Sequence, residues 1–274
     1  MSRFVSEPVK RIKHSCEGIG QTRRSDLTIQ HVKEGLHRAL HRLGIDVIRY
    51  TPSTFHGLRR IRLIDACKID LVLDVGANTG QYAKELRNNY SGRIISFEPL
   101  TAAYEQLRAA AGRDSKWECH QVALSEEDGS AVIHIAGNSA SSSLLPMREK
   151  HIRAAPASAY VGEETVATRS LDSLVRSGLA LAHKTLLKAD VQGLELAVLR
   201  GARMTLEAIC MIELELSLQE LYAGQPLFEE ICQYLRDSGF SLVSLGTGLV
   251  DLDSGAVLQL DGVFVNQGLR CELS

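Results

Sequence analysis

From Asp70 onward, short apolar runs alternate with longer amphipathic ones, and this alternation constrains the fold more than any other feature of the sequence. Short apolar runs bounded by Gly, Pro or polar residues predict strands, whereas apolar residues spaced three or four apart predict helices. Strands are expected within residues 70–75, 92–99, 116–124, 130–137, 185–191, 208–216, 240–245 and 257–266. Helices are expected within residues 81–89, 102–112, 171–178, 195–207 and 226–239.

Strands that alternate with helices build parallel βαβ units, in which helices cover both faces of one sheet. The last two expected strands have no helix between them, which predicts an antiparallel hairpin at one edge. The expected fold class is therefore α/β, with a doubly wound, mostly parallel sheet that ends in an antiparallel C-terminal hairpin. We expect residues 1–66 to form an N-terminal arm and helical extension, and residues 67–274 to form one domain.

The N-terminal extension contains a helical pattern of apolar residues at positions 28–43. His37 and His41 lie four residues apart in this pattern, so they would share one helix face and could be interpreted as a metal-binding pair. Because no acidic or third nitrogen ligand is evident beside them, we expect solvated histidines and no metal site.

Charge and composition are those of an ordinary globular protein. The chain has 274 residues, 23% of them charged, and a net charge of −2, so no general attraction to nucleic acid is expected. The first 70 residues carry 14 Lys and Arg against 7 Asp and Glu. We interpret basic clusters such as Arg59–Arg62 as a solvated face; the alternative is weak attraction to an anionic membrane or an acidic partner.

The six cysteines show neither CxxC pairs nor zinc-ligand spacing. Several lie in apolar runs such as AICMIEL, where cysteine packs as a small hydrophobic residue. We therefore expect no disulfide framework and a reducing, cytoplasmic environment. No apolar run is long enough to span a bilayer, and the N-terminus lacks the apolar segment of a signal peptide.

The stretch LVLDVGANTGQYAKEL, residues 71–86, predicts a strand, a glycine-bearing turn and a helix. Such a turn lies where open α/β sheets bind ligands, yet it matches neither GxGxxG nor the lysine-bearing phosphate loop. The carboxylate of Asp74 would repel phosphate and attract a cation or an ammonium group. Glu98 ends the next strand, where a carboxylate can accept hydrogen bonds from ribose hydroxyls. A nucleoside with a ribose, a positive charge and no phosphate describes S-adenosylmethionine (SAM).

At these residues the chain resembles the FkbM-type methyltransferases. The resemblance rests on VLDVGANTGQYAKELR, ISFEPL, TRSLDSL and LLKADVQGLELAVLRGA, and it extends from about Asp70 to Asn266. It implies a Rossmann-like, SAM-dependent enzyme, in a family of mostly O-methyltransferases of sugars, polyketides and glycolipids. One departure is Gln192, where the family often has Glu, so no role is assigned to a carboxylate there.

Six residues are predicted to bind the cofactor. Ala123 ends the third expected strand, where the resemblance would place the adenine. Several of these roles have a structural alternative. The two glycines could do no more than form a tight turn, Glu98 could simply end its strand, and Asn78 could cap the following helix. The predicted cofactor-binding residues are Asp74, Gly76, Asn78, Gly80, Glu98 and Ala123.

Two carboxylates are the candidates for chemistry on the acceptor. Asp190 ends the fourth main strand and could orient or deprotonate an acceptor hydroxyl, or it could cap the helix that begins near Leu194. Glu213 lies on an apolar strand, where a carboxylate is costly unless it is paired or wet. It could belong to the acceptor site or, with Asp190, hold a divalent metal; two carboxylates are too few, so no metal is assigned. A structural role is expected for Glu195.

The acceptor is expected to be a small-molecule or glycolipid hydroxyl, most simply on a sugar, with no nucleic acid partner. Residues 138–147 and 222–226 are loop-like and rich in hydroxyl and amide groups that suit a sugar. Alternatives are a polyketide or lipid hydroxyl as acceptor, or a SAM-binding protein without activity. The expected location is cytoplasmic, with weak peripheral contact to the inner membrane surface through the basic N-terminal part.

Overall fold

The computed structural model describes residues 35–269 and 271, and it divides into two compact units, Met1–Tyr50 and Thr51–Ser274. In the first unit, residues 35–42 form a helix that ends in a turn at residues 43–44. This agrees with the C-terminal part of the helix predicted at 28–43, whose start lies outside the described residues.

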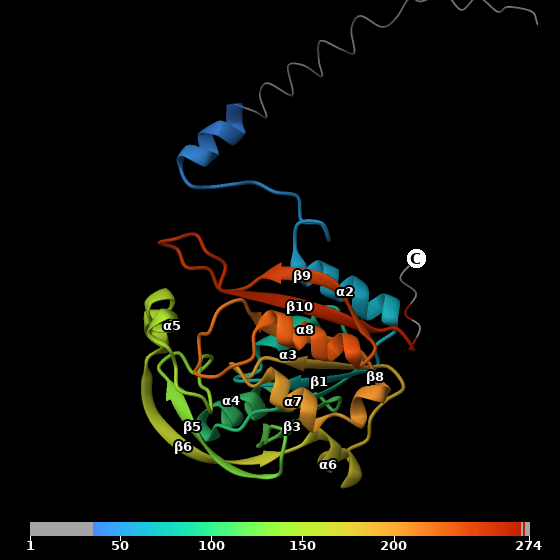
Figure 1. The fold of residues 1–274 in the computed structure, drawn as a ribbon. Helices are drawn as coiled ribbons and strands as arrows, with labels where there is room; N and C mark the ends of the chain where they lie inside the picture. Colours follow the sequence, from blue (N-terminus) through green and yellow to red (C-terminus); the bar gives the residue numbers. More distant parts are fainter. Residues whose placement is uncertain (1–34, 270, 272–274) are drawn as a thin grey trace, which may run out of the picture. The chain divides into compact units, whose positions relative to one another are not determined.

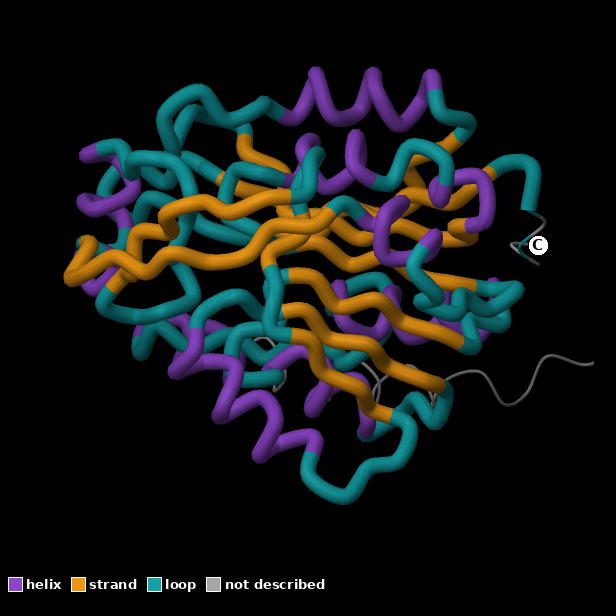
Figure 2. The backbone as a smooth tube through the Cα atoms, turned by 90° about the horizontal axis from the view of Figure 1, so that it is seen from below, coloured by secondary structure: helices purple, strands orange, loops and turns teal. Residues whose placement is uncertain are grey.

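A seven-stranded sheet forms the centre of the second unit (Figures 1 and 2). Its strand order is β3-β2-β1-β7-β8-β10-β9. The first five strands in this order are mutually parallel, and β10 runs antiparallel to both β8 and β9. The α/β class and the antiparallel C-terminal hairpin are therefore confirmed. The strands are Leu71–Val75 (β1), Arg93–Phe97 (β2), Trp117–His120 (β3), Thr185–Ala189 (β7), Ile209–Ser217 (β8), Phe240–Thr247 (β9) and Gln259–Asn266 (β10).

Helices cover both faces of this sheet, as the alternating pattern predicts. One face is packed by α2, α3 and α4, which contribute Ile64, Leu86 and Leu107 to a core with alternate strand residues. The opposite face is packed by α6, α7 and α8 around a second core. The helices are His56–Cys67 (α2), Gln81–Arg87 (α3), Thr101–Ala111 (α4), Leu171–Arg176 (α6), Glu195–Gly201 (α7) and Phe228–Asp237 (α8). The helix expected at 195–207 is shorter, because a separate 3₁₀ turn, Thr205–Ala208, follows it.

A second sheet of three strands, in the order β4-β6-β5, was not predicted. It consists of Ala123–Leu124 (β4), Gly129–Ala136 (β5) and Tyr160–Arg169 (β6), with the short helix Glu149–Ala154 (α5) between the last two. β6 escaped prediction because most of its residues are polar or exposed, which leaves no apolar run. The run expected as one strand at 116–124 is divided between the two sheets.

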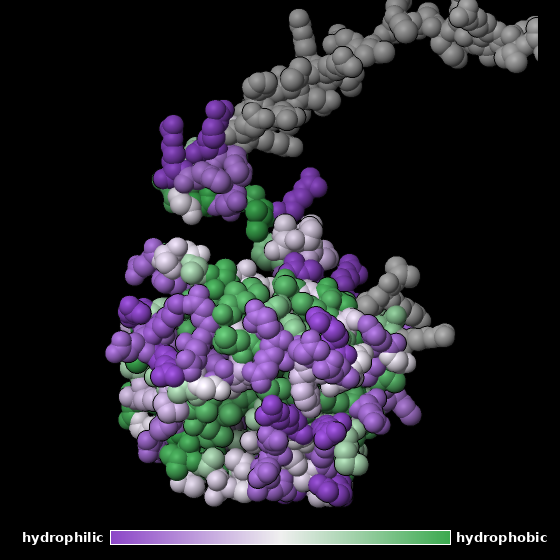
Figure 3. Space-filling view, in the orientation of Figure 1, coloured by the Kyte–Doolittle hydropathy of each residue, from purple (hydrophilic) through white to green (hydrophobic). Residues whose placement is uncertain are grey.

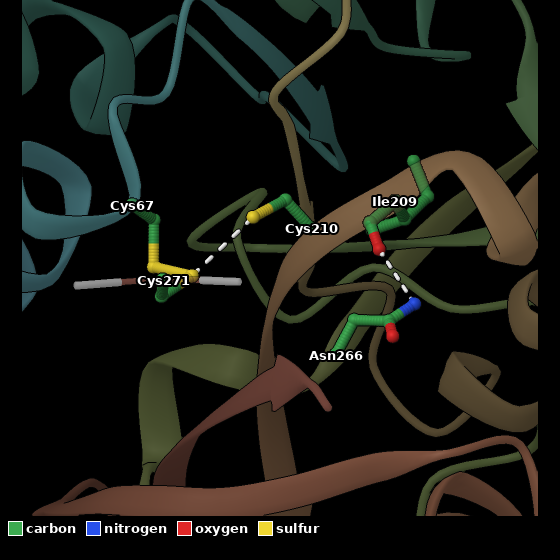
Figure 4. Close-up of a disulfide and its surroundings, with 5 residues drawn as sticks. All are labelled: Cys67, Ile209, Cys210, Asn266 and Cys271. Carbon is green, nitrogen blue, oxygen red and sulfur yellow. Dashed lines mark hydrogen bonds between the residues drawn. A yellow bond between two sulfur atoms is a disulfide. The ribbon is translucent and has the colours of Figure 1, made fainter. Parts of the chain in front are cut away.

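A disulfide joins Cys67, at the end of α2, to Cys271, just after β10 (Figure 4). The sulfur of the free, buried Cys210 lies 3.4 Å from that of Cys271. The expectation of unpaired cysteines is therefore wrong for this pair. No spacing pattern could reveal it, because the two residues are 204 positions apart and meet only after the sheet has formed.

The basic segment Arg59–Arg62 lies in α2, and it is not the solvated face that its composition suggested. Arg60 is only 8% exposed and binds Glu85 and Glu213. Arg59 donates hydrogen bonds to Ser244 and to the carbonyl of Leu245 in β9. Arg62 alone is exposed. Across the described part of the chain, no helix has the length and apolar character needed to cross a membrane.

Candidate active site

A pocket lies at the carboxyl ends of the parallel strands, where open α/β sheets bind their ligands. Its walls come from the segments that follow β1, β2 and β7, from β4, and from the loop between β5 and α5. Predicted site residues that line the pocket are Gly76, Asn78, Glu98, Ala123 and Asp190. The lining does not include Asp74, Gly80 or Glu213.

Glu98 follows β2 and accepts hydrogen bonds from two backbone amides. The N–H of Asn78 donates to Oε2 at 2.8 Å, and the N–H of Leu100 donates to Oε1 at 2.9 Å. Burial raises the pKa of the Glu98 carboxyl to about 7, although both amides act in the opposite direction. The side chain thus ties together the turns after β1 and β2, and each oxygen retains a lone pair for a hydroxyl donor.

Asn78 has a positive φ of 47°, a conformation that Asn adopts more readily than most residues. Its side-chain oxygen accepts a hydrogen bond from Ser139, whereas its buried Nδ2 has no partner among the described residues. The alternative in which Asn78 caps the next helix is wrong, because α3 begins after Gly80 without a side-chain cap. Buried amide donors normally have a partner, so this one is suited to a ligand acceptor.

The two glycines of the turn have different roles. Gly76 has a φ of 75°, and a Cβ there would lie 1.9 Å from the carbonyl oxygen of Asp190. It therefore allows the chain after β1 to pass close to the chain after β7. Gly80 has a φ of 82° and packs against Leu107 and Trp117, away from the pocket lining. The geometry of Gly80 is that of a residue needed only for the turn, whereas Gly76 also lines the pocket.

Asp74 lies inside the sheet with none of its surface exposed. Its Oδ1 is 3.3 Å from the ammonium nitrogen of Lys188, and its Oδ2 accepts a hydrogen bond from Ser96. Burial raises the pKa of the Asp74 carboxyl, and the positive charge of Lys188 opposes that shift. The cation that this carboxylate was expected to attract is thus a side chain of the same protein, directly opposite on the neighbouring strand.

Asp190 lies directly after β7 with 40% of its side chain exposed, so a ligand can reach it. Its Oδ1 accepts a hydrogen bond of 2.6 Å from Nε2 of Gln192, and its Oδ2 lies 3.8 Å from the ammonium group of Lys188. Asp190 does not cap α7, because the N-cap residue of this helix is Leu194 and no side-chain hydrogen bond caps its first turn. The turn is instead held by Glu195, which accepts from the amides of Val191 and Gly193, as its structural interpretation requires.

Gln192 is the residue whose importance the sequence did not reveal. Its amide nitrogen also donates to Glu215 at 2.9 Å, and its amide oxygen accepts from the hydroxyl of Tyr222 at 2.7 Å. Burial, followed by the negative charges of Asp190, Glu195 and Asp261, raises the pKa of the Glu215 carboxyl well above its usual value. A neutral amide at position 192 can bridge two carboxyl groups without adding a further negative charge. The sequence signal that could have pointed to this role is the presence of Gln192 where the family often has Glu.

Glu213 is buried under α2 and outside the pocket lining. Its oxygens accept hydrogen bonds from Arg60 at 3.2 Å and from Tyr82 at 2.8 Å. Burial would raise the pKa of Glu213, but His56, Arg60 and Tyr82 outweigh it and hold this pKa low. The carboxylate therefore has the paired environment that a charge on an apolar strand needs.

The loop between β5 and α5 brings hydroxyl groups to the pocket. Ser139, Ser142 and Ser143 line it, and the hydroxyl of Ser143 donates to the carbonyl of Gln192 at 2.7 Å. Tyr222, from the second loop expected to contact the acceptor, is fully buried, and its hydroxyl donates to the carbonyl of Ser141 in the first loop. No histidine appears in the described pocket lining.

These residues fit an adenosyl cofactor. The unpartnered Nδ2 of Asn78 offers a donor, the Glu98 carboxylate offers two acceptors suited to ribose hydroxyls, and Ala123 with Leu100 and Ile133 supplies an apolar wall. No lysine or arginine lines the described pocket, in accord with a ligand that carries no phosphate.

Comparisons with known proteins agree with this site. The family model of the methyltransferase FkbM domain matches residues 74–242, which is more than half of the chain. The chain is similar to the 2-O-methyltransferase NoeI of Sinorhizobium fredii (strain NBRC 101917 / NGR234), at 28% identity over 227 residues, covering 76% of this chain and 93% of that protein.

Two solved structures give lower similarity. An S-adenosylmethionine-dependent methyltransferase from Mesorhizobium loti has a TM-score of 0.43 at 8% identity, with 76% of this chain and 97% of that chain covered. Magnesium protoporphyrin IX methyltransferase from Synechocystis PCC 6803, with bound SAM, has a TM-score of 0.41 at 10% identity, with 82% and 88% covered. The extent of the family match decides the assignment: the chain belongs to the FkbM methyltransferases and is a SAM-dependent methyltransferase.

Proposed function

We propose that this enzyme methylates a hydroxyl group of a sugar, in a glycolipid. The observation that carries the proposal is the position of Asp190, an accessible carboxylate in the same pocket as Glu98 and Asn78. The name of the similar 2-O-methyltransferase supports oxygen as the methyl acceptor. The hydroxyl-rich loop over the pocket supports a sugar, because serine hydroxyls both donate and accept hydrogen bonds.

Glu98, Asn78, Gly76 and Ala123 would hold the cofactor, with the ribose at Glu98 and the adenine near Ala123. Asp74 would act indirectly, since its contact with Lys188 fixes the ends of β1 and β7 that frame the pocket. SAM supplies an electrophilic methyl group on a sulfonium ion. The protein must then bring the acceptor oxygen into line with that methyl group, and positioning of this kind can lower a barrier by several kcal/mol.

Asp190 would take the proton of the acceptor hydroxyl as the oxygen attacks. A carboxylate that accepts this proton makes the oxygen a better nucleophile, an effect typically worth 10²–10⁴-fold. Gln192 would orient the Asp190 carboxylate through its hydrogen bond to Oδ1, which leaves Oδ2 for the acceptor. Glu213 is assigned a structural role here, because its oxygens are already bound by Arg60 and Tyr82.

A cytoplasmic location with weak membrane contact through the basic N-terminal part belongs to the same proposal. The Cys67–Cys271 disulfide gives it a direct test, because such bonds are rare in a reducing compartment. Peptide mapping of protein trapped in intact cells with a thiol-blocking reagent measures whether this pair is bonded in vivo. A fully bonded population would contradict a reducing location.

The central experiment is transfer of a labelled methyl group from SAM into fractionated cell lipids and glycans, followed by mass spectrometry of the labelled product. We expect label on a sugar oxygen, and the Asp190→Asn variant should bind SAM normally while losing about 10²–10⁴-fold in turnover. Label on protein, nucleic acid or a nitrogen atom would overturn the acceptor assignment. Full activity of Asp190→Asn would overturn the role of Asp190.

A further inference from the structure

His37 and His41 lie on one face of the helix formed by residues 35–42, since side chains four apart are neighbours on a helix. Their rings are close, with centroids 4.3 Å apart. Both side chains are about half exposed, so an ion in solution can reach the two rings. This helix belongs to the N-terminal unit.

The turn after this helix returns the chain toward the two histidines. Gly44 has a φ of 70°, the amide of Gly44 donates to the carbonyl of His41, and the amide of Ile45 donates to the carbonyl of Leu40. This pair of hydrogen bonds around a left-handed glycine is the Schellman motif, which fixes the direction of the chain leaving a helix. Asp46 follows at once and is thereby placed beside the histidines.

From the sequence, no acidic residue was expected beside the two histidines. That expectation is wrong, because Asp46 lies next to both. Its Oδ1 lies 2.9 Å from Nε2 of His37 and 3.2 Å from Nε2 of His41. The three potential ligand atoms all lie within 4.8 Å of one another. Donor atoms around a tetrahedral zinc ion, each at about 2.1 Å from it, lie roughly 3.4 Å apart, so small rotations of these side chains suffice to admit an ion.

The electrostatic setting also favours a cation. The carbonyl groups at the C-terminal end of a helix carry a partial negative charge, and an anion is unfavourable there unless a positive charge accompanies it. Asp46 nevertheless lies beside the last turn of this helix, against two nitrogens that can act as ligands. The carboxylate, the two imidazoles and the helix C-terminus therefore all favour a bound cation.

We propose that His37, His41 and Asp46 bind one divalent transition-metal ion of the zinc type, through two imidazole nitrogens and one carboxylate oxygen. Two nitrogens and one oxygen suit Zn²⁺, Co²⁺ and Ni²⁺ better than Mg²⁺ or Ca²⁺, which prefer sets of oxygen ligands. Because the ligands are exposed, water completes the coordination. All three ligands belong to the N-terminal unit.

The test is calorimetric titration of the full chain with Zn²⁺, without an affinity tag and with the Cys67–Cys271 disulfide intact so that its sulfurs cannot bind the ion. We expect one saturable site, and at least tenfold weaker binding in each of His37→Ala, His41→Ala and Asp46→Asn. His183→Ala, which removes an exposed histidine elsewhere, should bind as tightly as the parent. Mg²⁺ at the same concentration should give no binding heat.

Co²⁺ absorption gives a second readout, since ligand-field bands report nitrogen and oxygen ligands directly, and far-ultraviolet circular dichroism checks that each variant is folded. Absence of saturable Zn²⁺ binding would overturn the proposal. Binding that persists in all three variants, or that disappears only in Cys210→Ser, would also overturn it by locating the ion elsewhere.

Discussion

The ammonium nitrogen of Lys188 lies 3.3 Å from Oδ1 of Asp74, and the two residues face each other on adjacent parallel strands in the middle of the sheet. Asp74 is fully buried and Lys188 nearly so, so each charge depends on the other. Asp190, which follows Lys188 by two residues, lines the methyltransferase pocket. A lysine inside an apolar strand indicates such a partner, and the sequence of β7, TLLKA, contained that signal.

Removing one member of this pair is expected to be costly. Lys188→Met leaves the Asp74 carboxylate buried without its cation, which should lower the free energy of unfolding by about 3–5 kcal/mol. The double variant Asp74→Asn/Lys188→Met removes both charges and should recover much of that loss. Urea denaturation measures both values, with the exposed Lys84→Met as the matched control. Equal losses in the single and double variants would show that the pair does not stabilise the fold.

SAM affinity should depend on pH through Glu98. Burial raises the pKa of this carboxyl from 4.5 to about 7. Between these two pH values the folded protein therefore holds a proton that the unfolded chain has lost. Stability of the ligand-free protein should therefore decrease as pH rises through this window. Ribose hydroxyls donate to the ionised form, so SAM affinity should rise toward pH 7, by at most about tenfold per pH unit, and then level off.

Calorimetry from pH 5.5 to 8.5 compares the parent with Glu98→Gln, which should bind more weakly and with a flatter pH profile. The pKa of Glu195 is also raised to about 7 by burial, but it titrates in both proteins, and their difference isolates Glu98. A profile of the same shape in both proteins would remove Glu98 from the cofactor site.

Substitutions of Glu213 and of Asp190 should affect different properties of the enzyme, the first its stability and the second its turnover. Glu213→Gln leaves the buried guanidinium of Arg60 without one of its anionic partners, so we expect a loss of several kcal/mol in the free energy of unfolding with an unchanged dissociation constant for SAM. Asp190→Asn should keep its stability and lose turnover instead. Thermal denaturation and SAM titration of both variants make the comparison. A stable but inactive Glu213→Gln variant would return Glu213 to the acceptor site.

The main sheet was predictable because its strands are short apolar runs between local stop signals, such as Pro99 after β2 and Gly112 after α4. Other elements were not, and α2 and β6 show why. The buried stripe of α2 begins with Arg60, so its apolar pattern is interrupted by a charge whose partner, Glu213, is far away in sequence. β6 has little buried surface of its own and is a strand because it pairs with β5.

The candidate site shows the same division. The positions of Glu98 and Asp190 followed from strand ends alone, since carboxyl ends of parallel strands share one edge of a sheet. The bridging role of Gln192 did not, because it depends on Glu215 and Tyr222, which come from other segments of the chain. Asp46 escaped notice beside the histidines because a Schellman turn, rather than helix periodicity, brings it there.

The Cys67–Cys271 disulfide should stabilise the second unit. It links residues 204 positions apart, and a cross-link over a long loop restricts the unfolded chain, which is typically worth about 2–4 kcal/mol. Cys67→Ser and Cys271→Ser should each lose this amount under oxidising conditions, and the parent should lose it when a phosphine reductant is added. Cys232→Ser, at a free cysteine, is the control. Denaturation midpoints that do not respond to the reductant would contradict the prediction.

Cys210 should replace Cys67 as the partner of Cys271 when Cys67 is absent, because their sulfurs are already 3.4 Å apart. In Cys67→Ser treated with glutathione disulfide, Cys271 should first form a mixed disulfide, which the Cys210 thiolate then attacks to release glutathione. Burial raises the pKa of the Cys210 thiol, so little thiolate exists at pH 7 and the second step should accelerate as pH rises. Peptide mapping without reduction should detect a Cys210–Cys271 link in this variant. In the double variant Cys67→Ser/Cys210→Ser, it should detect only glutathionylated Cys271. A link from Cys271 to Cys119 or Cys232 would show that Cys271 does not keep the position beside Cys210 that the structure gives it.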